Sequence, residues 1–234
     1  MTNVMLHAGE RSALIPADRA VLRGTLAWPT HPSGVVIFAH GSDSSRLSPR
    51  NQHVAERLRQ AGMATLLFDL LTSAEAADRA NVFDVPLLAK RLIAGAKWVA
   101  AQPEVGHLPL GLFGASTGAA AALVAAGASP EAFAAVVSRG GRPDLAGPAL
   151  PKVKAPTLLL VGSRDDRVLD LNRQALARMQ CQCELQVIPG ATHLFEEPGT
   201  LDNVARWAAN WFVRHLSMEK TWERCSCQVP AAKQ

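Results

Sequence analysis

Three short segments of the chain carry the residue types that acyl-transfer chemistry requires. Gly114-Ala115-Ser116-Thr117-Gly118 fits a G-x-S-x-G pattern, and the aspartates Asp165 and Asp166 and then His193 follow it. A serine hydroxyl is a poor nucleophile until a base removes its proton, and that base must be held by a third group. The order serine, acid, histidine therefore predicts a Ser–His–Asp catalytic triad.

The glycine-flanked serine lies where a strand is expected to turn into a helix. Small neighbours allow the tight turn that lifts the Ser116 hydroxyl above a sheet, and the helix N-terminus that follows favours developing negative charge. The alternative is a glycine-rich turn in which Ser116 only caps the helix. The partners further along the chain favour the nucleophile.

Two histidines follow Ser116, and two adjacent aspartates compete for the role of the acid. His215 lies late in the last predicted helix, where a solvated histidine is ordinary, whereas His193 lies in a loop after a strand. We therefore expect His193 to be the general base. Asp165 stands three residues before a valine, a spacing that favours it as the acid, and Asp166 would then cap the next helix.

A tetrahedral intermediate needs backbone N–H donors for its oxyanion, each worth roughly 3 to 4 kcal/mol. Thr117 follows the nucleophile directly and is expected to supply one of these N–H donors. Ser42 follows the strand that ends at Ala39 and is expected to supply the other. His40 and Gly41 would shape that second turn. His40 precedes the nucleophile in the chain, so we expect a structural role for it rather than that of the base.

Apolar segments of strand length alternate with amphipathic segments of helix length, which predicts parallel βαβ units with helices on both faces of the sheet. An antiparallel hairpin turned near Asp18 is expected before them. Residues 1–216 are predicted to form one domain, and residues 217–234 a loosely ordered tail. The expected strands are 13–16, 21–28, 35–39, 64–70, 108–113, 132–138, 155–161 and 184–188, and the expected helices 49–60, 85–101, 117–126, 169–179 and 201–216.

Composition limits the possible classes of protein. Of 234 residues, 48% are hydrophobic and 19% charged, which excludes a disordered chain. The most apolar stretch, Gly118 to Ala128, falls short of the about 18 residues that cross a bilayer. The net charge of +4 comes from 24 basic and 20 acidic residues without a cluster, which argues against nucleic acid as a partner. No secretory signal precedes Ser12, so a cytoplasmic protein with reduced thiols is expected.

These residues together resemble the α/β-hydrolase superfamily and, within it, the dienelactone hydrolase-like branch. The resemblance covers residues 11–216 and is carried by the His40-Gly41 turn, the Gly114–Gly118 elbow, Asp165 before Val168, and His193 before Leu194-Phe195. It implies an α/β-hydrolase fold, with a mostly parallel central sheet, an N-terminal antiparallel hairpin, helices on both faces and no large lid. It also implies that no cofactor or metal is needed.

A second resemblance concerns the segment after the first parallel strand. Ser44-Ser45-Arg46 and Ser48-Pro49-Arg50-Asn51 are similar to hydrolase domains that are fused to phosphoribosyltransferases. No phosphoribosyltransferase segment is expected within these 234 residues.

The chain departs from the family pattern at two positions. Ser116 stands where dienelactone hydrolases carry cysteine, so lactone-specific chemistry does not carry over. Asp43 stands where such turns prefer a small residue, and its carboxylate would weaken binding of an anionic acyl group unless Arg46 neutralises it. Arg139, after a predicted strand, is a candidate for binding a substrate carboxylate, although solvated loop arginines are commoner. Asp43, Arg46 and Arg139 are therefore the candidate substrate-binding residues.

The four cysteines form two Cys-x-Cys pairs, Cys181/Cys183 and Cys225/Cys227, whose spacing does not fit the usual zinc patterns. No metal is expected. The predicted function is hydrolysis of small or short-chain carboxylic esters by a monomer or homodimer. A thioesterase, amidase or acyltransferase with the same triad, or a non-catalytic binding protein on this fold, are the alternatives.

Overall fold

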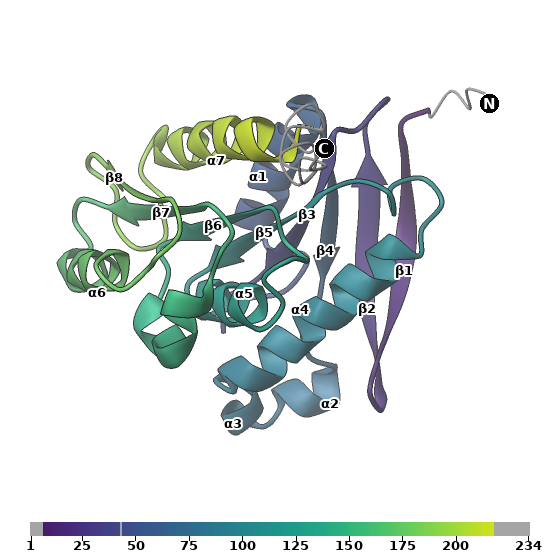
Figure 1. Cartoon of the computed structure of the whole chain (residues 1–234), viewed down its shortest axis with the longest axis horizontal. Coiled ribbons are helices and arrows are strands. Elements are labelled where there is room, and N and C mark those ends of the chain that lie inside the picture. The colour runs from purple at the N-terminus through teal and green to yellow at the C-terminus, as the bar shows by residue number, and fades with distance from the viewer. Residues whose placement is uncertain (1–6, 43, 218–234) are drawn as a thin grey trace, which may run out of the picture.

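The computed structural model describes residues 7–42 and 44–217, which form an eight-stranded sheet with helices on both faces (Figure 1). The strand order across the sheet is β1-β2-β4-β3-β5-β6-β7-β8. β1 and β2 pair antiparallel with each other, and β2 pairs antiparallel with β4, whereas all other pairs are parallel. The mostly parallel sheet and the N-terminal antiparallel hairpin are therefore confirmed.

The strands and helices have the following bounds. The strands are β1 Gly9–Ala17, β2 Ala20–Trp28, β3 Gly34–Ala39, β4 Met63–Phe68, β5 Leu110–Ala115, β6 Ala135–Arg139, β7 Thr157–Gly162 and β8 Cys183–Ile188. The helices are α1 Pro49–Gln60, α2 Ser73–Ala76, α3 Arg79–Val82, α4 Val85–Ala100, α5 Thr117–Ala128, α6 Asp166–Leu176 and α7 Thr200–Leu216, and Pro143–Lys152 forms a 3₁₀ segment, η1.

Side chains on the two faces of the sheet form two large cores, and Val161, Val168 and Leu169 form a small third cluster. On one face α4 and α5 pack together, and on the other α1 and α7 pack together (Figure 1). Because the central strands are covered on both sides, all six residues of β3 and of β7 are buried. The sheet is thereby a rigid support for the loops that follow the carboxyl ends of its strands.

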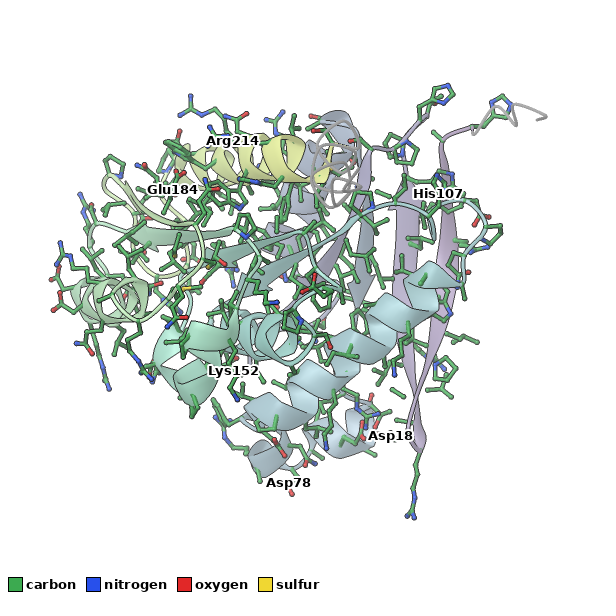
Figure 2. The ribbon with its side chains drawn as sticks, viewed as in Figure 1. Asp18, Asp78, His107, Lys152, Glu184 and Arg214 are labelled. Atoms are coloured by element: carbon green, nitrogen blue, oxygen red, sulfur yellow. The ribbon has the colours of Figure 1, made fainter. Side chains whose placement is uncertain are left out.

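The ends of the sheet are held by local contacts. The hairpin turns at Asp18, whose φ of 54° lies in the left-handed region that aspartate tolerates, and Figure 2 shows this residue at the hairpin tip. At the opposite edge Arg214 of α7 lies 3.6 Å from Glu184 of β8, and the two labelled side chains are neighbours in Figure 2.

Differences from the predicted elements lie at the boundaries and in the connections. β4 ends at Phe68 rather than at residue 70, and α6 begins at Asp166 rather than at residue 169. The short α2, α3 and η1 were not predicted. α2 is a single turn closed by a capping box between Thr72 and Glu75, which is too short for hydrophobic periodicity to reveal.

Candidate active site

Ser116 occupies the sharp turn between β5 and α5. Its φ of 52° and ψ of −121° are strained for a residue with a side chain, and such strain costs about 1 to 3 kcal/mol. The flanking glycines allow this turn. A Cβ on Gly114 would lie 2.8 Å from the backbone nitrogen of Ala119, and one on Gly118 would collide with the carbonyl oxygens of Ala39 and His40. The G-x-S-x-G spacing therefore reflects close backbone approach on both sides of the serine.

The three residues predicted as a triad lie together at the carboxyl edge of the sheet. His193 Nε2 lies 3.3 Å from Ser116 Oγ, and His193 Nδ1 lies 2.6 Å from Asp165 Oδ2. The Asp165 side chain is 14% exposed and that of His193 37%, so the carboxylate is shielded while the imidazole remains accessible to a substrate. The geometry permits the Nδ1–H group of His193 to donate a hydrogen bond to Asp165, which leaves Nε2 free to accept the proton of the serine.

The competing candidates lie elsewhere. Asp166 is exposed as the first residue of α6, whereas Asp165 precedes the helix and makes no side-chain cap there. His215 lies in α7 with its ring 4.5 Å from the ring of Trp211. Only Asp165 and His193 therefore have the positions that the serine requires.

The turn after β3 lies directly against the nucleophile. A Cβ on Gly41 would lie 3.3 Å from Ser116 Cβ and 4.0 Å from its Oγ, so the next residue, Ser42, is beside the reacting centre. Thr117 is buried and is the first residue of α5, so its N–H has no partner within the helix. Ser42 and Thr117 are therefore both neighbours of Ser116.

His40 fixes the orientation of this turn. The Leu70 N–H donates to His40 Nε2 over 3.1 Å, so the proton is on Nδ1, which donates to the Gly41 carbonyl over 2.9 Å. Because the C=O and N–H of one trans peptide point in opposite directions, holding the Gly41 carbonyl also orients the Ser42 N–H. Burial lowers the pKa of His40, which favours this neutral form. The structural role predicted for His40 agrees with these contacts.

The three candidate substrate-binding residues have different surroundings. Asp43 lies outside the described residues. Arg46 pairs with Asp69 through its Nη1 at 2.9 Å and its backbone N–H at 2.8 Å, so its charge is balanced there. Arg139 is 8% exposed at the end of β6, and its carbonyl accepts a hydrogen bond from the Ser116 N–H over 3.1 Å. The solvated loop arginine considered as the alternative is therefore not what the structure contains.

Asn172 supports the site and was not singled out in the sequence. Its Nδ2 donates to the carbonyls of Gly141 and Val168, at 3.0 and 2.8 Å, and so ties the turn after β6 to α6. That turn borders the nucleophile, because the Arg142 N–H donates to the Ser116 carbonyl over 3.2 Å. The sequence did contain a signal that could have revealed Asn172: a polar asparagine within the apolar stripe of an amphipathic helix.

A pocket of about 200 Å³ opens beside Ser42. Apolar side chains such as Leu70, Leu71 and Leu88 line it together with polar residues such as Ser44 and Asp69. No large lid covers the site within residues 7–42 and 44–217. The pocket can hold a small substituent of a substrate bound at Ser116.

The cysteines and possible metal ligands do not form a second centre in the described ranges. No group of three or more His, Cys, Asp or Glu side chains gathers there in an arrangement that could hold a metal ion. Cys181 and Cys183 are free thiols, and burial raises the pKa of both, that of Cys183 to about 12. Cys225 and Cys227 lie outside the described residues. In the same ranges, no helix is long and apolar enough to cross a membrane.

Solved structures with a similar fold include a dienelactone hydrolase and esterases. A dienelactone hydrolase from Anabaena variabilis is 51% identical, with a TM-score of 0.87 over 90% of this chain and 100% of its own. Est1E from Butyrivibrio proteoclasticus is 16% identical, with a TM-score of 0.74 over 87% of this chain and 98% of its own. This second likeness concerns the fold alone.

Comparison of the amino-acid sequence with known proteins finds a longer relative and a matching protein family. A Mycobacterium tuberculosis protein named "Putative phosphoribosyl transferase Rv0571c" is 61% identical over 202 residues, which are 86% of this chain and 46% of that protein. This chain thus spans a little under half the length of that relative. Residues 22–221 match the Dienelactone hydrolase family, a range that includes the whole site described above. The chain belongs to the dienelactone hydrolase family of α/β-hydrolases.

Proposed function

We propose that this protein is a carboxylesterase-like serine hydrolase that cleaves small or short-chain carboxylic esters. The observation that carries the proposal is the continuous contact from Asp165 through His193 to Ser116, with the serine in a strained turn at the start of a helix. The hydrolase family is consistent with it. The phosphoribosyl transferase name belongs to a longer relative, of which the matched residues are only 46%, and we do not extend that activity to this chain.

In the proposed mechanism Ser116 Oγ attacks the ester carbonyl while His193 Nε2 takes its proton. Asp165 holds the imidazole in the required tautomer and stabilises the imidazolium. The backbone N–H groups of Ser42 and Thr117 bind the oxyanion of the tetrahedral intermediate. His193 then protonates the leaving alcohol, and water releases the acid from the acyl-enzyme by the same steps in reverse.

The small pocket beside Ser42, with a volume of about 200 Å³, supports the preference for small esters. No cofactor or metal takes part in the proposed steps. We also propose that residues 1–216 act as one domain and that the protein works in the cytoplasm, where thiols such as those of Cys181 and Cys183 stay reduced.

Labelling with a fluorophosphonate probe tests this proposal, with the modified peptide read by mass spectrometry beside a p-nitrophenyl acetate assay. We expect phosphonylation at Ser116, its loss in His193→Ala, and a decrease of roughly 10⁶ in kcat for Ser116→Ala. A folded wild-type protein that is neither labelled nor active would overturn the proposal. Labelling at another serine would overturn the assignment of Ser116.

A further inference from the structure

A groove of about 530 Å³ lies between α4 and the tip of the N-terminal hairpin. Pro16, Ala17 and Asp18 form its hairpin wall, and residues 90–98 of α4 form the other wall. Figure 1 shows α4 lying across the hairpin, and Figure 2 labels Asp18 at the hairpin tip. The groove shares no lining residue with the pocket beside Ser42, so it is separate from the proposed site of ester hydrolysis. Its volume is within the range of about 300 to 1,000 Å³ that is typical of small-molecule sites.

The α4 wall has a cation at each end and apolar side chains between them. Lys90, Ile93, Ala94 and Lys97 stand at positions i, i+3, i+4 and i+7, so they lie along one face of the helix. The two lysines are exposed, whereas Ile93, Ala94 and the neighbouring Trp98 are half-buried. A rise of 1.5 Å per residue places the Cα atoms of the two lysines about 10 Å apart. The wall is therefore amphipathic along its length.

The positive charge of this wall is not balanced by ion pairs within the described residues. No ion pair there includes Lys90 or Lys97. Among the described residues that line the groove, Asp18 is the one with a negative charge, and it is exposed at the hairpin tip. The groove thus has an excess of positive charge, which attracts anions.

Arg91 holds the two walls of the groove together. Its side chain is 4% exposed, and its Nη1 donates to the carbonyl of Ala17 on the hairpin wall. Its Nη2 lies 2.6 Å from the carboxylate of Glu75 in α2, so the charge of this arginine is balanced. Because the link crosses from helix to hairpin, the groove keeps its width without a ligand. A preformed site loses less free energy to ordering when a ligand binds.

We propose that this groove binds a small amphipathic carboxylate. The apolar body of the ligand packs on Ile93 and Trp98, and its carboxylate pairs with a lysine at one end of the α4 wall. A neutral apolar molecule would leave the lysines unpaired, and an inorganic anion would leave the apolar centre uncovered. The concave shape favours a single small molecule over the flat surface of a membrane. Carboxylic acids are also products of the ester hydrolysis proposed above, but binding in the groove does not depend on that activity.

Octanoate and 1-octanol test the proposal because they have chains of the same length and differ in charge. Dissociation constants come from ligand-observed NMR, and the fluorescence of tryptophan locates the site. We expect the wild type to bind octanoate more tightly than 1-octanol and to change its fluorescence on binding. Trp98→Phe should lose most of the change in fluorescence and still bind octanoate in the NMR measurement, since phenylalanine keeps an apolar ring in the groove.

Two kinds of variant separate the charge from the apolar wall. The double variant Lys90→Gln/Lys97→Gln should raise the Kd for octanoate by about 3- to 20-fold, the range expected for two exposed charges, and leave that for 1-octanol nearly unchanged. Ile93→Thr should weaken both ligands alike, because it makes the centre of the wall polar. The matched control is Lys152→Gln/Lys154→Gln, which removes the same charge beside another cavity, of about 540 Å³, and should leave octanoate binding unchanged.

Several results would contradict the proposal. Equal affinities of the wild type for octanoate and 1-octanol would show that charge does not select the ligand. An octanoate affinity that is unchanged in the double variant at Lys90 and Lys97, or equally weakened in the control, would place the ligand elsewhere. Binding to phosphatidylglycerol vesicles without binding of octanoate would assign the groove to a lipid surface instead. A protein that hydrolyses no ester would refute the hydrolase proposal and leave these binding measurements as a complete test of the groove.

Discussion

The carboxylate that contacts His193 is selected by the path of the chain into α6. Asp165 is the last residue before the helix and turns its side chain toward the imidazole, whereas Asp166 begins the helix and faces solvent. Neighbouring residues at such a junction point in different directions. Two adjacent aspartates, although they are the same residue type, therefore have different surroundings.

This difference predicts unequal effects of two similar substitutions. Asp165→Asn should lower kcat by about 10⁴ because the amide no longer holds the imidazole in the tautomer that accepts the serine proton. Asp166→Asn should change kcat by less than about threefold, since its side chain is exposed, and it serves as the control. Steady-state kinetics on p-nitrophenyl acetate measure both. Equal losses in the two variants would contradict the assignment of the acid.

The sequence could predict the triad residues but not the surroundings of Arg139. The G-x-S-x-G pattern and the order of acid and histidine depend on local turns, which short motifs encode. Arg139 ends β6, whose side chains Ala135 and Val137 pack on the face of the sheet covered by α1 and α7, and both helices lie more than 50 residues away in the sequence. Arg46 pairs with Asp69, a contact between loops that no local pattern reveals, and its expected role beside Asp43 stays a prediction because Asp43 lies outside the described residues.

At the scale of the elements, the site depends on how closely α5 approaches β3. Gly118 lies in the first turn of α5, and a Cβ there would collide with the carbonyl oxygens of Ala39 and His40 at the end of β3. The backbone of both elements would have to move, because carbonyl oxygens in a central strand cannot rotate away. The oxyanion turn follows β3 directly, so the nucleophile and the predicted donors would separate.

Gly118→Ala should therefore lower both stability and activity. We expect a loss of about 1 to 3 kcal/mol in the free energy of unfolding, typical of overpacking, and a decrease in kcat/KM of at least about tenfold. Urea unfolding and ester kinetics measure the two effects. Gly95→Ala in α4 is the control for activity: its Cβ would meet the buried ring of Phe68 at 3.0 Å, so it should cost some stability but leave kcat/KM unchanged, because it lies away from the turn after β3. A Gly118→Ala protein as active as the control would contradict the close-packing argument.

Hydrophobic periodicity predicted the long elements because each buries one face or both. α1 has the predicted bounds, residues 49 to 60. Ser48 caps its N-terminus and Pro49 is its first residue, both of which are typical of a helix start. α6 begins three residues earlier than predicted, because its first turn is polar and the apolar pattern starts only at Val168. The connections α2, α3 and η1 bury few side chains, so their positions are set by capping bonds and prolines instead.

At the scale of the whole molecule, His40 links the stability of the fold to pH. It joins the end of β3 to the residues after β4 through Leu70, and burial lowers its pKa below the ordinary value of 6.5. The unfolded chain therefore binds a proton more readily than the folded one. The stabilisation from neutral His40 is fully present above pH 6.5 and decreases as the pH falls below it.

We expect the free energy of unfolding to decrease between about pH 7.5 and about pH 5.5, with at most about 1.4 kcal/mol of that decrease due to His40. In His40→Gln this part should disappear, because glutamine does not titrate, although the variant is less stable at both pH values. His107→Gln is the control: His107 is exposed in the connection before β5 (Figure 2), so its variant should keep the wild-type pH dependence. Urea unfolding at the two pH values measures all three proteins, and an unchanged pH dependence in His40→Gln would show that the imidazole takes up its proton as readily in the folded protein as in the unfolded chain.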